Sequence, residues 1–239
     1  MSTDRVTCTI DGGIADVRLN RADKHNGLDP AMFDAIVEVG RRLLDDRSLR
    51  VVILSGEGPS FCAGLDFKAF MTGGPAVRDK LLARGDESIA NLAQRVAWIW
   101  TELPVPVIAA VHGACVGGGL QIALAADLRV VHPDAKLAVR EIVYGLIPDM
   151  SISKTLARLV RLDVAKELTF TGRSWIVGQP RDEAERRGLA GVELATGEGQ
   201  LLGNVEPNQP RERLADAHVG DQAVDDLAHG QLGVGVDHA

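Results

Sequence analysis

The sequence predicts an α/β fold, because short runs of β-forming residues alternate with segments of helical periodicity and short turns join them. Two of the runs, 51–54 and 107–111, are apolar throughout, as is typical of strands buried inside a sheet. Hydrophobic residues make up 46% of the 239 residues and charged residues 25%. This composition is that of a globular protein with a sizeable core, and it excludes a disordered or fibrous chain.

The first elements that we expect are a strand pair and a helix. Residues 5–10 and 14–19 are rich in β-forming residues, and the Asp-Gly-Gly at 11–13 is typical of a hairpin turn. The Asp-Pro at 29–30 predicts a helix start, since Asp caps helices and Pro fits their first turn. The glycine-rich segment 56–74 predicts a loop with a short helix. Further expected strands are 51–54, 107–111, 128–131 and 137–139, and further expected helices are 86–103, 120–126, 152–160 and 164–170.

The composition changes abruptly near Arg173. Residues 174–239 contain five Arg, no Lys and 12 Asp or Glu, so this segment carries the whole net charge of −7. It also holds ten of the 26 glycines. We therefore expect two parts, a folded core at 1–173 and an atypical acidic tail at 174–239. The tail's composition is typical of a loosely folded or partly disordered segment, or of translation in a shifted reading frame; an authentic C-terminal segment is the alternative.

Charge, hydropathy and cysteine content exclude several classes of protein. The net charge of −7 argues against a nucleic-acid partner. No stretch reaches about 18 apolar residues and the first residues contain no apolar leader, so we expect neither membrane association nor secretion. Three cysteines at unrelated spacings argue against a disulfide scaffold and a zinc ribbon, and we expect no metal site. These features together predict a cytoplasmic protein.

Two glycine-rich turns follow the two apolar runs. The first, at 61–66, reads Phe-Cys-Ala-Gly-Leu-Asp, and the second, at 112–119, ends in three glycines that lead directly into a helix. A helix start leaves backbone N–H groups unpaired, so one N–H from each turn could form an oxyanion hole for a single oxygen. The alternative is that the glycines only permit tight turns and close packing. Neither turn has the glycine spacing of a dinucleotide site or a P-loop.

The two turns, together with segments 21–28 (RADKHNGL) and 141–149 (EIVYGLIPD), resemble the crotonase superfamily of enoyl-CoA hydratases and isomerases in order and spacing. The resemblance implies a crotonase-like spiral of ββα units over about residues 5–173, with an atypical C-terminal segment. It also implies an acyl-CoA substrate, a role in fatty acid metabolism, and assembly into a homotrimer or hexamer. No cofactor is implied, since coenzyme A is part of the substrate.

The resemblance also implies roles for individual residues. The backbone N–H groups of Leu65 and Gly118 would form the oxyanion hole. The residues that would bind the substrate are Lys24, His25, Ala63, Asp66, Phe67, Lys68, Gly117 and Gln121. For two of these substrate-binding residues there are alternatives: Asp66 could be a cap or turn residue, and Phe67 could belong to the pocket wall or the core.

The acid–base residues separate the reactions that the resemblance allows. Hydratases of the superfamily carry a glutamate at the position of Gln121, and its dienoyl-CoA isomerases usually carry an acid there as well, whereas glutamine cannot ionise. Glu141 and Asp149 resemble the carboxyl pair of the dienoyl-CoA isomerases, so we expect both to be catalytic and double-bond isomerisation to be favoured. The alternatives are an enoyl-CoA hydratase and an inactive acyl-CoA binder. Asp149 could instead cap the following helix, and Glu141 could be a surface acid.

Overall fold

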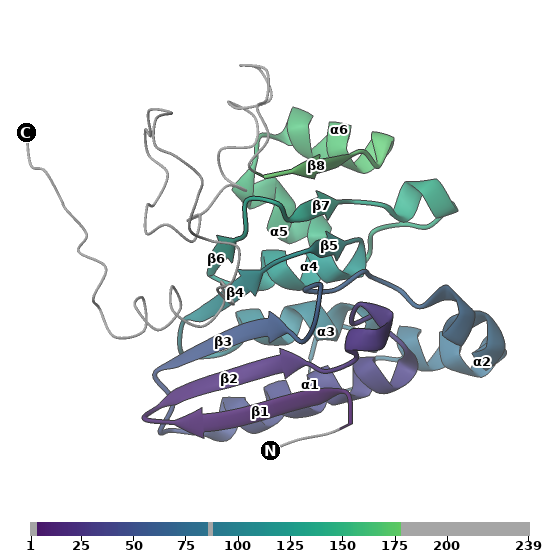
Figure 1. Cartoon of the computed structure of the whole chain (residues 1–239). Helices are drawn as coiled ribbons and strands as arrows, with labels where there is room; N and C mark the ends of the chain where they lie inside the picture. The colour runs from purple at the N-terminus through teal and green to yellow at the C-terminus, as the bar shows by residue number, and fades with distance from the viewer. Residues whose placement is uncertain (1–3, 86–87, 178–239) are drawn as a thin grey trace, which may run out of the picture.

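The computed structural model describes residues 4–85 and 88–177, and within these ranges it confirms the α/β class (Figure 1). The predicted hairpin and all six predicted strands are present. The expectations of disorder and of a shifted reading frame concern mainly residues 178–239, which lie outside the described residues.

The main sheet has five strands. The N-terminal hairpin pairs β1 with β2 in antiparallel register, and the remaining neighbours are parallel (Figure 1). The two central parallel strands are buried on both faces over residues 51–54 and 107–111, which accounts for their continuous apolar runs. In spatial order the strands are β1 (Val6–Asp11), β2 (Ile14–Leu19), β3 (Val51–Gly56), β4 (Val107–Val111) and β6 (Leu128–Val131).

A second sheet of three short strands lies beside the first. β7 (Lys136–Ala138) is its centre, with β5 (Ala114–Val116) parallel on one side and β8 (Ser174–Ile176) antiparallel on the other. Trp175 in β8 is buried, with 6% of its surface exposed. The strand begins directly after Arg173, so the described fold includes the first four residues on the tail side of the composition change.

Three helices pack as a layer on one face of the main sheet. α1 (Pro30–Asp45) contacts α3 (Leu92–Thr101), which in turn contacts α4 (Gly118–Ala125), as Figure 1 shows. As predicted, Asp29 caps α1, since its side chain accepts a hydrogen bond from the N–H of Met32 at 2.8 Å. The largest side chains that the layer and the sheet bury together include Phe33, Ile36, Leu54, Trp100, Leu120 and Ile122.

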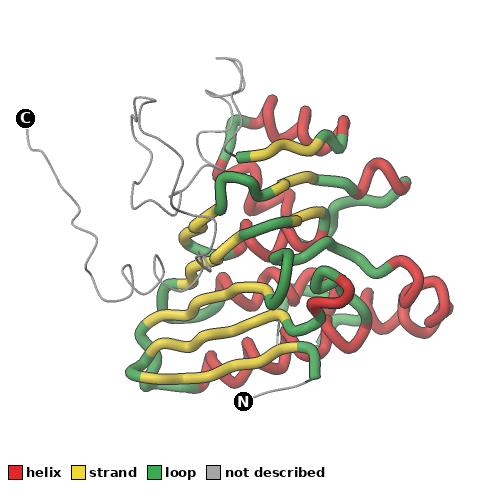
Figure 2. The backbone as a smooth tube through the Cα atoms, viewed as in Figure 1, coloured by secondary structure: helices red, strands yellow, loops and turns green. Residues whose placement is uncertain are grey.

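Two helices differ in length from the sequence prediction. The helix expected at 86–103 begins only at Leu92, because Asn91 forms a capping box with Gln94, and Ile89 is 78% exposed rather than packed. The short helix expected within 56–74 is α2 (Phe67–Leu82), which is kinked at Gly74 and Pro75. Figure 2 shows the remaining helical segments, which are η1 (Ala22–Lys24), η2 (Glu141–Tyr144), α5 (Ile152–Leu159) and α6 (Leu162–Thr171).

Candidate active site

The two glycine-rich turns lie against each other at the carboxyl ends of β3 and β4. The N–H of Cys62 donates to the carbonyl of Ala114 at 2.9 Å, and the N–H of Val116 donates to the carbonyl of Cys62 at 3.0 Å. The start of α4 approaches the same peptide closely: a Cβ at Gly119 would lie 2.3 Å from the carbonyl oxygen of Cys62. Only glycine therefore allows the second turn to pack this closely on the first.

Replacement of Gly119 by alanine is expected to lower the free energy of unfolding by about 1–3 kcal/mol, because the new methyl overlaps a backbone carbonyl that cannot rotate away. Gly85→Ala is the matched control, since no atom lies within 4 Å of its added Cβ, and we expect it to change stability by no more than about 0.5 kcal/mol. Urea denaturation of both variants measures the difference. Equal stability of the two would contradict the close packing of the turns.

The backbone of residues 64–66 forms hydrogen bonds with Leu28 along one of its two edges. The N–H of Leu28 donates to the carbonyl of Gly64 at 2.8 Å, and the N–H of Asp66 donates to the carbonyl of Leu28 at 2.9 Å. Successive peptide groups of an extended chain point to opposite sides, so the N–H of Leu65 points away from Leu28. A Cβ at Gly64 would lie 3.5 Å from the nitrogen of Gly118, which shows how near the second turn is.

The N–H groups of Leu65 and Gly118 are free of protein acceptors among the described residues. Gly118 is the first residue of α4, where no carbonyl of the preceding turn is in position to accept from it. Both N–H groups can therefore donate to an oxygen from outside the protein, and the helix start favours negative charge there.

A carboxyl group lies beside the start of α4. Glu141, at the beginning of η2, accepts a hydrogen bond at Oε1 from Nε2 of Gln121 at 2.6 Å. A Cβ at Gly117 would lie 3.3 Å from the same Oε1. Within residues 4–85 and 88–177, Oε2 of Glu141 and Oε1 of Gln121 are buried and have no hydrogen-bond partner. The hydrogen bond from Gln121 therefore orients the carboxyl through Oε1, and Oε2 is the oxygen that could accept a proton or a hydrogen bond from a bound molecule.

Burial makes Glu141 harder to ionise than an ordinary glutamate. Desolvation is the main cause that raises its pKa, and the negative charge of Asp149 acts in the same direction. Hydrogen bonding to the backbone N–H of Glu141 itself and then to the side chain of Gln121 opposes this rise in pKa without cancelling it. A carboxyl with a raised pKa in a partly buried position can exchange a proton nearer to neutral pH. Its burial and its hydrogen bond with Gln121 set Glu141 apart from an ordinary exposed acid.

Asp149 lies at a more exposed position than Glu141. The protein atoms packed around its carboxyl nevertheless raise its pKa by desolvation. It does not cap the following helix, because α5 begins at Ile152 and Ser151 occupies the N-cap position. Ser151 adopts a left-handed conformation with φ of 75°, which is uncommon for a residue other than glycine and is often found at functional sites.

The segment that follows β2 contains the two basic residues assigned to coenzyme A. Lys24 ends η1 and His25 follows it, and both side chains are exposed. Nδ1 of His25 lies 2.9 Å from Oγ of Ser60, which also accepts from the N–H of Ala114. His25 is thereby tied to the second glycine-rich turn. Ala63 and Lys68 are exposed on the first turn and on α2.

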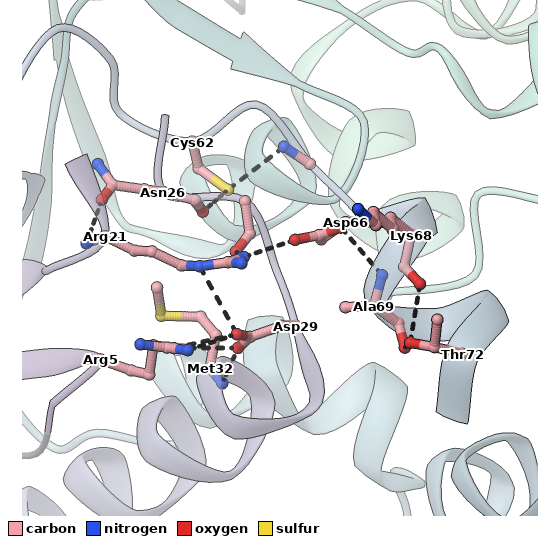
Figure 3. Close-up of polar contacts among 12 residues, drawn as sticks. Arg5, Arg21, Asn26, Asp29, Met32, Cys62, Asp66, Lys68, Ala69 and Thr72 are labelled. Atoms are coloured by element: carbon pink, nitrogen blue, oxygen red, sulfur yellow. Dashed lines mark hydrogen bonds and ion pairs between the residues drawn. The ribbon is translucent and has the colours of Figure 1, made fainter. Parts of the chain in front are cut away.

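Asp66 has the capping role that the sequence allowed. Its carboxylate accepts from the N–H of Ala69 at 3.1 Å and pairs with Arg21, whose Nη1 lies 2.8 Å away (Figure 3). These contacts, the cap first, hold its pKa below the ordinary value. The next residue, Phe67, packs its ring on that of Tyr144, with 4.5 Å between the centroids.

The structure thus brings Leu65, Gly117 and Gly118 together with the Gln121–Glu141 pair. Sequence reasoning missed two residues of this region, Arg21 and Tyr144. Both stand in segments whose resemblance was noted, but only the fold reveals their contacts. In the described residues, no three His, Cys, Asp or Glu side chains gather as metal ligands. Over the same residues, no helix is long and apolar enough to cross a membrane.

The α/β layers and the paired glycine-rich turns define a crotonase-type fold. The sequence model of the enoyl-CoA hydratase/isomerase family matches residues 9–203, and this chain belongs to that family. The match continues past Arg173, where we expected the resemblance to end.

Curated relatives and a solved structure agree with this membership. The chain is 35% identical over 173 residues to enoyl-CoA hydratase domain-containing protein 2, mitochondrial, of Bos taurus, covering 70% of this chain and 55% of the relative. It is 31% identical over 181 residues to Delta(3,5)-Delta(2,4)-dienoyl-CoA isomerase, mitochondrial, of Rattus norvegicus, covering 70% and 52%. The chain therefore spans about half the length of the curated relatives it matches. A crystal structure from Thermobifida fusca YX, determined in complex with acetoacetyl-CoA, has a TM-score of 0.70 and 25% identity, covering 95% of this chain and 80% of that one.

The prediction of a cytoplasmic protein is wrong by this comparison. The relatives from Bos taurus, Rattus norvegicus and Arabidopsis thaliana are all named as mitochondrial proteins. The physical reason for the error is that unpaired cysteines exclude only an oxidising compartment, and they do not separate the cytoplasm from other reducing compartments.

Proposed function

We propose that this chain binds an unsaturated acyl-CoA thioester and moves its C=C double bond by proton transfer. The observation that carries the proposal is the Glu141 carboxyl, which is partly buried, has a raised pKa and lies beside Gly117, the residue that precedes the N–H of Gly118. A carboxyl in this position can take a proton from carbon while the amides stabilise the charge that forms.

The thioester oxygen would accept hydrogen bonds from the N–H groups of Leu65 and Gly118. Removal of a proton next to the thioester carbonyl moves an electron pair onto that oxygen, which becomes an enolate. Two fixed N–H donors at the start of a helix stabilise this charge more than they stabilise the neutral thioester, and the barrier falls. Gly117 would contribute by keeping α4 close to Glu141, since a side chain there would fill the space next to the carboxyl.

The two carboxyl groups would act on different carbons. In one direction, the ionised Glu141 takes a proton from the carbon next to the carbonyl, and a protonated Asp149 returns one to a carbon farther along the chain. The raised pKa of each group suits this exchange, since a carboxyl of ordinary pKa is rarely protonated near neutral pH. The substrate loses one proton, gains one proton and takes up no water. Glu141 ends protonated and Asp149 ionised, and proton exchange with the solvent restores both groups for the next turnover. The steps require no cofactor beyond the coenzyme A of the substrate.

Gln121 favours isomerisation over hydration. Addition of water needs groups that both hold and activate it, and Gln121 supplies a hydrogen-bond donor where a second carboxylate would be. Hydration remains the second candidate because one of the relatives is named as an enoyl-CoA hydratase domain protein. The residues that we assign to the coenzyme A moiety and the thioester path are Lys24, His25, Ala63, Asp66, Phe67 and Lys68.

Three assays test the proposal: isomerisation of a 3-enoyl-CoA, isomerisation of a dienoyl-CoA, and hydration of a 2-enoyl-CoA, each beside a calorimetric titration with acetoacetyl-CoA. We expect turnover in at least one isomerisation and slower hydration. Faster hydration would favour the second candidate. Binding without turnover would identify an inactive acyl-CoA binder, and absence of both binding and turnover would refute the proposal.

The Gln121→Glu variant is expected to raise hydration of a 2-enoyl-CoA by about tenfold or more, because it places a second carboxyl at hydrogen-bond distance from Glu141. Two carboxyls this close share a proton, so one of them is available as an acid while the other is a base. Gln121→Met, which fills similar space but cannot ionise, is the control and should show no gain. Equal hydration by both variants would contradict the role assigned to the missing carboxylate.

We further propose that the chain assembles as a homotrimer or hexamer. Exposed apolar side chains on η2 and α6 support this, since such side chains on a monomer commonly mark a contact surface. Analytical ultracentrifugation measures the state, and a monomer at all concentrations would contradict it. The exposed apolar residues of these two segments are Ile142, Val143, Tyr144, Leu162 and Phe170.

A further inference from the structure

We propose that Arg21 is a positioning residue that holds the N–H of Leu65 in the direction needed to bind the thioester oxygen; this inference rests on the proposed function. Arg21 does not touch the Leu65 amide. It acts on segment 64–66, which contains the amide, and on segment 27–29, which pairs with it (Figure 3).

The Arg21 guanidinium bridges both segments. Its Nη1 donates to the carbonyl oxygen of Gly27 at 2.9 Å and pairs with Oδ2 of Asp66 at 2.8 Å. Its Nε lies 3.6 Å from Oδ2 of Asp29. Figure 3 shows the end of the Arg21 side chain reaching both acids, Asp66 in one direction and Asp29 in another. Only 14% of its side-chain surface is exposed, so solvent screens these contacts weakly.

These contacts flank the backbone pairing that orients Leu65. Leu28 pairs with Leu65 through Gly64 and Asp66, as described above. Arg21 binds the residue before Leu28 and the side chain of the residue after Leu65. The planar guanidinium carries several N–H donors, so this one group binds at both ends of the Leu28–Leu65 pairing. A lysine ammonium is less suited to this because its donors share one nitrogen. Without Arg21, the two backbone hydrogen bonds of this pairing remain, together with one from the N–H of Ala63 to the carbonyl of His25 at 2.9 Å and a thiol contact from Cys62 to the carbonyl of Asn26 at 3.1 Å. All of these lie at or before the backbone N–H of Asp66, whose side chain Arg21 binds.

The first turn is held firmly at Cys62 and Ala63, but its support is weaker at Gly64, directly before Leu65. Gly64 has φ of 90°, a conformation that glycine reaches easily and also leaves easily. The Sγ of Cys62 accepts from the N–H of Gly64 at 3.4 Å, which is a weak contact. Small rotations of this turn would redirect the Leu65 N–H, and a displacement of about 1 Å at a reacting centre can lower a rate by about 10²-fold.

Arg5 provides a matched control. It also pairs with Asp29, through Nε at 3.0 Å and Nη2 at 2.8 Å, but no contact joins it to Gly27 or Asp66 among the interactions that the structure gives. Arg5→Gln therefore weakens the cap of α1 without loosening the first turn. Arg21→Gln removes contacts to both segments. A role that is only structural predicts similar behaviour of the two variants.

The experiment compares Arg21→Gln and Arg5→Gln with the unchanged chain in three measurements. The first is isomerase kcat and KM with the substrate that is turned over. The second is the ratio of the dissociation constants of acetoacetyl-CoA and free CoA. The third is the ¹⁵N–¹H NMR position of the Leu65 amide in leucine-labelled protein, assigned with a Leu65→Met sample, which needs neither substrate nor activity.

For Arg21→Gln we expect kcat to fall by about 10- to 100-fold with a smaller change in KM, the acetoacetyl-CoA preference to shrink, and the Leu65 resonance to move. Arg5→Gln should leave all three near their original values while lowering thermal stability. An unmoved Leu65 resonance in Arg21→Gln, or equal losses in both variants, would overturn the inference. If the unchanged chain shows no acetoacetyl-CoA preference and no turnover, the proposed function fails, whereas the NMR comparison still decides whether Arg21 sets the amide.

Discussion

Replacement of Glu141 by glutamine is expected to lower isomerase turnover by about 10²- to 10⁴-fold and, at neutral pH, to make the folded chain more stable. The loss follows because an amide cannot take a proton from carbon. The gain in stability follows because the carboxylate is partly desolvated and has an unpaired buried oxygen. Desolvating a charged carboxylate costs more free energy than desolvating a neutral amide. The new NH₂ could also donate to the unpaired Oε1 of Gln121.

The pH dependence of this effect has a definite sign. The pKa of Glu141 is higher in the folded chain than in the unfolded chain, so the folded chain binds the proton more tightly. As the pH rises from the unfolded value of about 4.3 through the raised folded value, the unchanged chain loses stability that the variant keeps. The stability difference should therefore be small in acid and largest above the folded pKa.

Denaturation in urea at a series of pH values, beside the isomerase assay, measures both effects. Glu38→Gln is the matched control, because Glu38 is exposed on α1 and pairs only with Arg42 nearby. It should keep its activity and change stability by no more than about 0.5 kcal/mol. If Glu141→Gln retains turnover, Glu141 is not the base; if it loses stability throughout this range, the desolvation account is wrong.

Local sequence signals predicted the elements of this fold well. The Asp-Pro at 29–30, the Asp-Gly-Gly hairpin and the apolar strand runs each act through residues within a few positions, and each prediction is confirmed. The helix predicted at 86–103 failed for the same kind of reason. Its apolar periodicity extended back to Ile89, but the capping box between Asn91 and Gln94 determines where the helix begins.

The candidate site was less accessible to sequence reasoning because its contacts are distant along the chain. Gln121 and Glu141 are 20 positions apart, and nothing local to either indicates their hydrogen bond. The contact between Arg21 and Asp66 spans a longer stretch still. Sequence reasoning supplied the residue types and their order, whereas the packing of two turns at adjacent strand ends determined which of them meet.

The second large effect is expected at Gly118, where proline should lower kcat by about 10²- to 10³-fold relative to alanine. Proline removes the N–H that we assign to the oxyanion hole, and alanine keeps it. Gly118 is the first residue of α4, the helix position at which proline is best tolerated. The preceding residue, Gly117, has no Cβ and has ψ of −121°, outside the α region that a following proline disfavours.

The alanine variant separates the loss of the N–H from the addition of a side chain. A Cβ at Gly118 would lie 2.8 Å from Cδ1 of Leu28 and 3.0 Å from Sδ of Met150, and both variants introduce it. Both neighbours are ends of flexible side chains, so each variant should fold, with circular dichroism and thermal denaturation as the check. Isomerase kcat and acetoacetyl-CoA affinity of the two variants then report on replacement of the N–H by the ring carbon of proline, with the added Cβ common to both. Equal kcat in two folded variants would mean that the amide of Gly118 does not stabilise the enolate, and the oxyanion would have to be held by Leu65 together with some other donor.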